Sequence, residues 1–350
     1  MPIRIAIVGL GRAAHRIHLP AVAKLAGVEV VGGHDLHPPA QAPSFPLFDS
    51  PAELLAQTRP DMLFIVTPPD SHFALTKLGL EAGCHVFCEK PLAERIEDAE
   101  ALAELARAAG RHVVVNSEFP WMPIHSAAKR RMAEPGFGKL QFITLQQTFI
   151  VTPETEEGWR GLDPQRTFKE FGTHVLDLAQ YFFDEAPMSI RARMPRPAGP
   201  AAPDHLNIVE LEFSGERMAL ILLDRLSPGR HRYLDIRLDG TEAIIETSIG
   251  GRLQAAAGLN ARTRKPFVDV EVAMGGTARL YREERMERLA TAPIDLFPDA
   301  TARLLTDVLA AIDRGETPPC ALEHSTRTLR LLAAAYESAE DGGSPRAFAP

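Results

Sequence analysis

Residues 3–14, IRIAIVGLGRAA, decide the fold of the first part of this chain of 350 residues. The first half of the stretch carries aliphatic side chains on both faces, which is typical of a buried strand in a parallel sheet. Gly9, Gly11 and Ala14 follow at the spacing G-x-G-x-x-A. In this pattern the first glycine permits a tight turn, the second lets the backbone approach a pyrophosphate, and the small third residue lets the next helix pack on the strand. The stretch therefore predicts a dinucleotide site, with a helix over residues 14–26 directing its N-terminal N–H groups at a phosphate.

An acidic residue follows the next strand at the distance expected for a ribose ligand. Residues 28–31 read as that strand, and Asp35 lies 26 residues after Gly9. An acid about 20 residues beyond the glycine pattern typically binds a ribose hydroxyl, and a carboxylate there would repel the 2′-phosphate of NADP. We therefore expect NAD as the cofactor. NADP is the less favoured alternative, which the nearby bases Arg12 and His34 keep open.

Strands and helices alternate up to residue 116. Short apolar runs read as strands, and the stretches between them carry helix signals such as Ser50 before Pro51 at a start and Gly110 at an end. This alternation is the sequence form of a doubly wound parallel sheet. Beyond the first two strands, the expected elements are strands at 62–66, 85–88 and 112–115 and helices at 70–82 and 94–109.

The pattern changes in the rest of the chain. After about residue 189, strands follow one another without helices, which predicts an antiparallel sheet in an α+β domain. Asp239-Gly240 is a hairpin signal between the last two of these strands. We place a dinucleotide-binding domain at 1–118 and an α+β domain at 119–350. The expected elements of the latter are a helix at 121–134, strands at 139–151, 189–193, 207–213, 217–225, 233–238 and 242–247, and helices near 295–314 and 322–340.

Composition excludes several classes of protein. Apolar residues make up 45% of the chain and charged residues 24%, as in ordinary globular proteins. The formal net charge of −8 argues against a nucleic-acid partner. No apolar run approaches the length of a membrane span, and we expect neither a membrane partner nor a signal peptide. Cys84, Cys88 and Cys320 fit no zinc spacing, so we expect buried reduced thiols, no metal and a cytoplasmic location.

The strand at 85–88 ends in a charged and stiff turn, Glu89-Lys90-Pro91. Proline cannot donate to a sheet ladder, and it pushes Lys90 out of the helical region. A lysine is therefore held at the carboxyl edge of the sheet, where ligands bind in open α/β folds. Taken alone, the stretch is equally compatible with a solvated structural lysine.

A second group of chemically active side chains lies in residues 169–183. On a helix of about 3.6 residues per turn, one face carries Glu170, His174, Asp177 and Tyr181. His174 can change protonation near neutral pH, and Glu170 lies one turn away. The face is either an acid–base cluster or an exposed helix surface with an incidental histidine.

Together these motifs resemble the Gfo/Idh/MocA family of oxidoreductases, which includes glucose–fructose oxidoreductase and inositol 2-dehydrogenase. The resemblance covers nearly the full length of the chain. It rests on GLGRAA at 9–14, TPPDSH at 67–72, Glu89-Lys90-Pro91, FGTHVLD at 171–177 and the final helix at 329–338.

The resemblance implies a nicotinamide cofactor on the first domain. It also implies that the second domain, an open-faced sheet, covers the substrate and forms a homodimer or homotetramer. Lys90 would position or deprotonate the substrate hydroxyl, and His174 would be the general acid/base. Glu170 stands where the family often has an aspartate, so a carboxylate is kept with a longer reach. The implied cofactor-binding residues are Gly9, Gly11, Arg12, Ala14, Asp35, Thr67, Pro68, His72, Glu89 and Lys90.

The expected reaction is NAD-dependent hydride transfer from, or to, a secondary hydroxyl carbon of a sugar, cyclitol or related polyol. Oxidation of an alcohol needs a base for the O–H proton while the hydride leaves to the nicotinamide. Two alternatives stay open, namely an NAD-assisted glycosidase and a sugar or nucleotide sensor without chemistry. The two tryptophans are equally well explained by packing. The candidates for the substrate pocket are Asn116, Trp121, Trp159, Arg160, Arg166, Asp177 and Tyr181.

Overall fold

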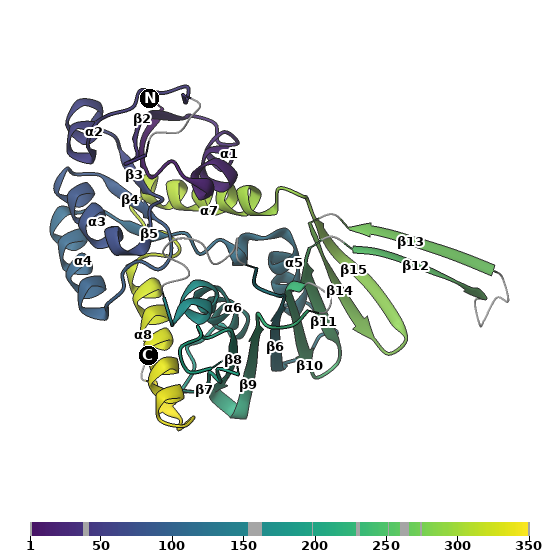
Figure 1. The fold of residues 1–350 in the computed structure, drawn as a ribbon. Helices are drawn as coiled ribbons and strands as arrows, with labels where there is room; N and C mark the ends of the chain where they lie inside the picture. The colour runs from purple at the N-terminus through teal and green to yellow at the C-terminus, as the bar shows by residue number, and fades with distance from the viewer. Residues whose placement is uncertain are drawn as a thin grey trace. The chain divides into compact units, whose positions relative to one another are not determined.

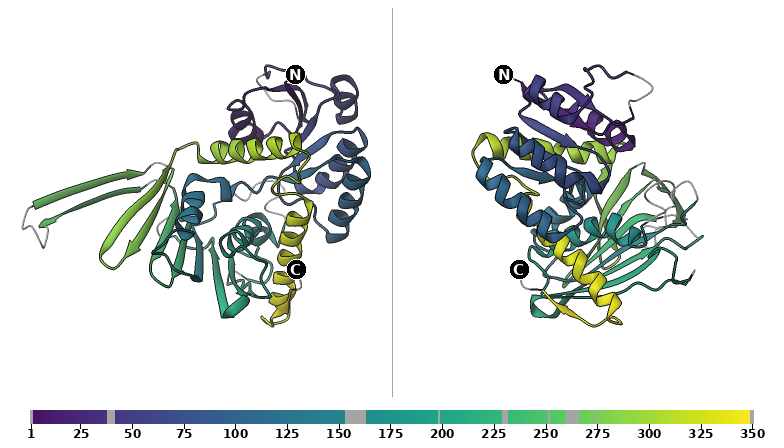
Figure 2. Two further views of the ribbon diagram at one scale, coloured as in Figure 1. Left: turned by 180° about the vertical axis from the view of Figure 1, so that it is seen from behind. Right: turned by 60° about the vertical axis from the view of Figure 1, so that its left-hand side comes forward.

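The computed structural model divides into two compact units (Figures 1 and 2). It describes residues 2–37, 42–152, 163–197, 199–228, 232–250, 252–259, 266–273 and 275–348. The first unit comprises Met1–Trp121, Lys169–Asp177 and Phe297–Ala334, and the second comprises Met122–Phe168, Leu178–Leu296 and Ala335–Pro350. Residues 169–177 and 297–334, which the sequence placed in the second domain, thus pack within the first unit.

The first unit is built on a five-stranded sheet with the order β2-β1-β3-β4-β5. All of its strand pairs are parallel. The expected doubly wound parallel sheet is confirmed, and its strands lie within a few residues of the predicted bounds. These are β1 (Ile3–Val8), β2 (Val28–His34), β3 (Met62–Ile65), β4 (His85–Cys88) and β5 (Val113–Val115).

Helices cover both faces of this sheet. Phe64 and Phe87 belong to a core cluster with Leu304 and Val308 of a C-terminal helix. Side chains alternate along a strand, and Leu63 accordingly faces the opposite side, where it meets Gly79 of a helix that follows β3. The helices of this unit are η1 (Ala14–His18, a π-helix), α1 (Leu19–Val22), α2 (Pro51–Thr58), η2 (Pro69–Ser71), α3 (His72–Glu81), α4 (Ile96–Ala109), η3 (Phe119–Trp121), α7 (Leu296–Asp313) and α8 (Leu322–Glu340).

In the turn after β1, Gly9 and Ala14 have the roles predicted from the glycine pattern. Gly9 has a φ of 93°, and a Cβ there would lie 2.4 Å from the carbonyl oxygen of Val66. Ala14 is fully buried in the core between sheet and helix. The helix expected over 14–26 is shorter and irregular, because η1 passes into α1 at Pro20. A proline lacks the N–H that would continue the ladder of hydrogen bonds.

The cysteines and the helices of the described residues can be compared with the expectations. Cys84, Cys88 and Cys320 are buried free thiols, as expected. The segment at Cys320 also forms an isolated antiparallel bridge to β5, in which the Cys320 carbonyl oxygen accepts the N–H of Val115 over 3.0 Å. No described helix combines the length and the apolar character needed to cross a bilayer.

The second unit is built on a nine-stranded sheet with the order β15-β14-β11-β10-β6-β9-β8-β7-β16. Among the strands that the structure describes in this sheet, β6 and β9 alone pair in parallel, so the predicted mainly antiparallel sheet is confirmed. A separate two-stranded sheet joins β12 to β13. The strands are β6 (Leu140–Thr148), β7 (Ser189–Arg193), β8 (Leu206–Phe213), β9 (Arg217–Asp224), β10 (Arg232–Gly240), β11 (Ile244–Ile249), β12 (Arg252–Leu259), β13 (Pro266–Ala273), β14 (Gly276–Arg282), β15 (Arg285–Ala292) and β16 (Arg346–Ala347).

One face of the large sheet carries the core. Helix α5 (Pro123–Met132) contacts β11, β14 and β15. Phe183, the last residue of helix α6 (Thr173–Phe183), stacks on Phe213 of β8 with 4.1 Å between ring centroids. The opposite face is polar and holds a hollow of about 640 Å³, which agrees with an open-faced sheet. Its lining includes Thr144, Gln146, Asp235, Arg237, Glu246 and Ser248.

The hairpin predicted at Asp239-Gly240 joins β10 to β11, but its turn lies later. Asp239 pairs with Ile244, so the turn spans residues 240–243. The glycine is required by packing, since a Cβ on Gly240 would lie 2.3 Å from the carbonyl oxygen of Phe137. The Asp-Gly pair therefore marks a close approach of two backbones as well as a hairpin.

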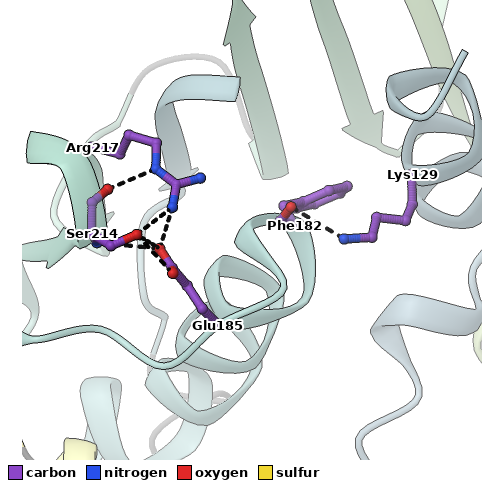
Figure 3. Close-up of polar contacts among 5 residues, drawn as sticks. All are labelled: Lys129, Phe182, Glu185, Ser214 and Arg217. Atoms are coloured by element: carbon purple, nitrogen blue, oxygen red, sulfur yellow. Dashed lines mark hydrogen bonds and ion pairs between the residues drawn. The ribbon is translucent and has the colours of Figure 1, made fainter. Parts of the chain in front are cut away.

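The C-terminal end of α6 is held by two polar contacts (Figure 3). Lys129 of α5 donates to the carbonyl oxygen of Phe182 over 3.3 Å, and a cation at a helix C-terminus is favoured by the helix dipole. Just beyond the helix, Glu185 accepts hydrogen bonds from Ser214 and Arg217 at the β8–β9 turn. These contacts fix the last turn of the helix whose first turn carries His174.

Candidate active site

Lys90 stands at the carboxyl edge of the parallel sheet and is anchored there. Glu89 continues the ladder, because its N–H donates to the carbonyl oxygen of Ile65 over 2.9 Å. The Lys90–Pro91 peptide bond is cis. The Lys90 ammonium group donates to the main-chain carbonyl oxygen of Glu170 over 2.7 Å. The alternative of a freely solvated lysine is therefore wrong.

Glu89 is held as a carboxylate beside Lys90. His18 of η1 donates from Nε2 to Glu89 Oε1 over 2.7 Å, and the Asn116 amide donates to the same oxygen over 2.9 Å. Burial by itself would raise the pKa of Glu89. The hydrogen bonds from His18 and Asn116 and the positive charges of His18 and Lys90 outweigh burial and lower the pKa to about 2. Glu89 thus supplies a fixed negative charge at the edge of the sheet.

His174 is buried, so the alternative of an exposed helix face is wrong. Its side chain is 7% exposed, and its ring stacks on Phe119 with 4.1 Å between centroids. Burial, with the positive charge of Lys90 as the next cause, lowers the pKa of His174 to about 3. The imidazole is therefore neutral at neutral pH and can accept a proton.

The helical projection put Glu170 on one face with His174 but missed the local geometry. Residues Phe168–Gly172 form a π-helix, η6, and turns of this kind are frequent at functional sites. Lys90 contacts the main-chain oxygen of Glu170, whereas the projection directed attention to its carboxylate. A π-turn gives up regular helix hydrogen bonds, and it forms only where tertiary contacts replace them. The residue pattern of this segment did not predict the π-turn.

Asp177 lies one turn beyond His174 and is 2% exposed. Its Oδ1 accepts a hydrogen bond from Nε2 of His324 on α8. Among the described residues, Asp177 Oδ2 has no hydrogen-bond partner. The negative charge of Asp177 is the main cause that raises the pKa of His324.

Glu118 is the functional candidate that the sequence reading missed. It follows Asn116 at the carboxyl edge of β5 and is 3% exposed. Burial, and then the negative charge of Glu89, raise the pKa of Glu118 to about 8. The sequence held a usable signal, because a carboxyl group two residues beyond Asn116 lies at the same sheet edge as Lys90.

The predicted cofactor residues gather at this edge too. Asp35 accepts the N–H of Leu10 in the glycine-rich turn over 2.6 Å and the N–H of His37 over 2.7 Å. Thr67 and Pro68 form the turn after β3, where the Thr67 hydroxyl accepts a hydrogen bond from Ser71 over 2.6 Å. Arg12 is exposed beside the glycines.

His72 is fully buried and joins two loops of the edge. Its Nδ1 lies 2.7 Å from the carbonyl oxygen of Pro91 and its Nε2 lies 2.9 Å from that of Thr67. Burial alone would lower the pKa of His72, but Cys88 and the two carbonyl groups outweigh it and raise the pKa to about 9. A doubly protonated ring donates to both carbonyls, so His72 positions the two loops from inside the fold.

The remaining substrate candidates are placed differently. Trp121 donates from its indole to Asp307 over 2.7 Å within the first unit. Tyr181 belongs to the second unit, where the Lys129 ammonium lies 5.4 Å from its ring centroid. Arg166 is buried in the second unit. The candidates Trp159 and Arg160 lie outside the described residues.

Comparison with known families decides the identity of this fold. Residues 3–117 match the model of an oxidoreductase family with an NAD-binding Rossmann fold, and residues 129–346 match the C-terminal alpha/beta domain of the same family. The chain belongs to the Gfo/Idh/MocA family. It is therefore an oxidoreductase, and its parallel sheet is the NAD-binding domain of that family.

Several relatives within the Gfo/Idh/MocA family have named activities. A D-apiose dehydrogenase from Paraburkholderia graminis is 26% identical over 96% of this chain and 88% of its own length. A D-glucoside 3-dehydrogenase from Escherichia coli is 34% identical over 51% of this chain and 54% of its own length. Among solved structures, an Agrobacterium radiobacter oxidoreductase in complex with NAD⁺, L-tartaric acid and magnesium is 18% identical, has a TM-score of 0.80 and aligns over 99% of this chain and 98% of that one. At this identity the structural match shows a shared fold.

The residues of the glycine-rich turn fit the NAD of the Gfo/Idh/MocA family. A Cβ on Gly11 would meet no protein atom within 4 Å, which leaves the backbone open to a phosphate oxygen. Asp35 keeps lone pairs beyond the two that accept main-chain N–H groups, and these suit ribose hydroxyls. Gly9, Gly11 and Asp35 would therefore hold the pyrophosphate and the ribose.

Proposed function

We propose that the protein is an NAD-dependent dehydrogenase that oxidises a secondary hydroxyl group of a sugar, cyclitol or related polyol. The observation that carries this proposal is the juxtaposition of an anchored lysine and a neutral, buried histidine near one sheet edge. The Lys90 ammonium rests on the Glu170 carbonyl, and Lys90 is close enough to contribute to the lowered pKa of His174. The names of the relatives, dehydrogenases of D-apiose and of D-glucosides, support the substrate class.

The residues divide the chemistry of alcohol oxidation between them. The bound nicotinamide supplies the hydride acceptor. His174, neutral at neutral pH because its pKa is lowered to about 3, accepts the hydroxyl proton. The Lys90 ammonium orients the substrate oxygen and stabilises the negative charge that develops on it. The Glu170 carboxylate contributes negative charge that raises the pKa of His174, which makes the imidazole a better base.

The test is NADH formation with a panel of D-apiose, methyl D-glucosides and myo-inositol. We expect NADH and a carbonyl product in equal amounts, and a lower kcat/KM with NADP than with NAD. Hydrolysis of a glycoside without net NADH would identify the NAD-assisted glycosidase instead. Tight NAD binding without turnover of any panel member would identify a sensor.

We also propose that the protein is a homodimer or homotetramer in the cytoplasm. The polar, open face of the nine-stranded sheet is the surface we assign to the contact between subunits, since its hollow is lined by paired charges such as Arg237 and Glu246. Light scattering on the purified chain gives the subunit number. A monomer at micromolar concentration would contradict this assignment.

A further inference from the structure

Glu118 is a buried acid between two residues that contact the catalytic candidates. Asn116, two residues before it, donates to Glu89 over 2.9 Å. Phe119, the next residue, stacks its ring on His174 with 4.1 Å between centroids. The backbone of the β5 edge therefore places Glu118 between the Glu89–Lys90 turn and the first turn of α6.

One oxygen of Glu118 has no protein partner. Its Oε2 is buried and makes no hydrogen bond to any part of the chain that the structure describes. A buried polar group without a partner is unfavourable, and such a group in a native protein needs an explanation, for example a catalytic role or a bound water or ion. The side chain is also 3% exposed, so bulk solvent does not supply the missing partner.

A second buried acid of the first unit, Asp177, also has an unpaired oxygen atom. Its Oδ2 is buried and also lacks a partner among the described residues, while His324 holds Oδ1. Burial and the negative charge of Glu89 are the main causes that raise the pKa of Glu118 to about 8, and the charge of Asp177 contributes less. At neutral pH, Glu118 therefore carries a proton that it can donate. A hydroxyl group of a bound ligand can accept this hydrogen bond.

We propose that Glu118 is a substrate-binding residue whose neutral carboxyl group donates a hydrogen bond to a second hydroxyl of the polyol, beside the hydroxyl that is oxidised. This proposal rests on the proposed function and names its substrate more narrowly, as a polyol with adjacent hydroxyl groups. Lys90 and His174 act on one oxygen, and Glu118 recognises its neighbour.

The charged and titratable groups around Glu118 set the expected pH dependence. Glu89 and Lys90 face it from the β4 edge, Asp177 from α6, and Cys320 from the segment before α8. Lys90 is the cation among them and lowers the pKa of Glu118, whereas Glu89 and Asp177 raise it. Ionisation of Glu118 above its pKa removes the donor and adds a second negative charge beside Asp177. Binding of the polyol should therefore weaken as the pH rises through about 8.

The experiment compares Glu118→Gln, which keeps a neutral donor, with Glu118→Leu, which removes it. With the polyol that the panel selects, wild-type KM should rise by about tenfold, the size of one lost hydrogen bond, from neutral pH to one unit above the Glu118 pKa. Glu118→Gln should lose this pH dependence, and Glu118→Leu should show a raised KM at every pH. Glu104→Gln, the same change at an exposed site on α4, should keep the wild-type profile. A deoxy analogue that lacks the neighbouring hydroxyl should bind wild type more weakly than the parent polyol does. Glu118→Leu should bind the deoxy analogue and the parent polyol equally well.

A spectroscopic measurement does not depend on turnover. The infrared C=O band of a protonated carboxyl group in the NADH complex should be present in wild type, absent in Glu118→Gln, and shifted by glycerol or by the panel polyols. If no polyol is oxidised but the band shifts on polyol binding, the proposed dehydrogenase activity fails and the binding role of Glu118 stands. The role of Glu118 is refuted if polyols are oxidised but wild type and the two Glu118 variants do not differ. They would then share the same KM, the same pH profile of KM and the same infrared band.

Discussion

The Lys90 ammonium group donates a hydrogen bond to the main-chain carbonyl oxygen of Glu170 over 2.7 Å. The contact joins the turn after β4 to the π-helical turn η6, and both Lys90 and Glu170 belong to the first unit. Because the acceptor is a backbone atom, the position of Lys90 does not depend on the Glu170 carboxylate. Replacement of the two side chains should therefore have separable effects.

Lys90→Met should remove turnover while NAD still binds. The variant loses the cation that orients the substrate oxygen, so kcat should fall by about 100-fold or more. The NAD dissociation constant, measured by titration of NADH fluorescence, should change by less than about threefold, since the ammonium is worth little to a cofactor held by backbone and ribose contacts. Lys77→Met on α3, an exposed lysine paired with Glu81, is the matched control. Normal turnover of Lys90→Met would overturn the role of this residue.

As the pH is lowered, kcat/KM should not fall through protonation of His174 near the ordinary histidine pKa. Burial and Lys90 lower the pKa of His174 to about 3, so the imidazole stays neutral from neutral pH down to about two units above that value. His174→Asn should reduce kcat by about 100-fold without changing the shape of the profile in this range. An ionisation near pH 6.5 that disappears in His174→Asn would show that the ring is charged in the working enzyme.

Asp35→Ala should weaken NAD binding and narrow the preference for NAD over NADP. The carboxylate accepts N–H groups of Leu10 and His37, so its removal loosens the glycine-rich turn as well as the ribose contact. We expect the NAD dissociation constant to rise by about tenfold, the equivalent of one charge-assisted hydrogen bond. Asp35→Asn, which keeps one acceptor oxygen, should lose less affinity. Parallel titrations give the ratio of the NAD and NADP dissociation constants for each protein. The same ratio in wild type and in Asp35→Ala would refute this assignment.

The His18–Glu89 pair should behave as a coupled unit in unfolding experiments. His18→Leu leaves Glu89 with one partner fewer in a mostly buried site, which costs about 3 kcal/mol. Glu89→Gln in the same chain removes the charge, so the double variant should be less destabilised than the sum of the single variants. The pKa of Glu89 is lowered to about 2 from an ordinary value of 4.5, so its stabilisation is complete above pH 4.5 and is lost as the pH falls toward 2. A coupling free energy near zero at neutral pH would contradict the pairing.

His72 should make the stability of the protein decline in alkaline solution. Its pKa is raised from 6.5 to about 9, so its contribution is complete below pH 6.5 and is lost as the pH rises through 9. The shift corresponds to about 3 kcal/mol. Melting temperatures of wild type and His72→Gln should therefore differ most at pH 6.5 and converge above pH 9. His112→Gln is the control, because burial lowers the pKa of His112 and it does not titrate in this range. If the difference in melting temperature between wild type and His72→Gln stays constant over this pH range, His72 is neutral.

The residues by themselves determined the features that depend on neighbours in the sequence. The positive φ of Gly9, the burial of Ala14 and the stop at Pro91 follow from turn sterics and from the missing N–H of proline, which act over a few residues. Strand–helix alternation then gave the parallel sheet, and it brought Lys90, Asp35 and Asn116 to one edge, because the carboxyl ends of parallel strands coincide. The antiparallel sheet was also predicted, although the strands between residues 252 and 292 were not assigned.

Only the tertiary structure decided which atoms meet at that edge. The π-turn that offers the Glu170 carbonyl to Lys90, the pairing of Asp177 with His324, and the unpaired oxygen of Glu118 each depend on packing between segments far apart in the sequence. The pKa values of Glu118 and His174 depend on the same packing, because desolvation is set by the surrounding fold and not by the residue. The sequence thus determined the sheet, its cofactor edge and the residue types present. Long-range packing determined which of them are neutral, charged or left with an unpaired atom.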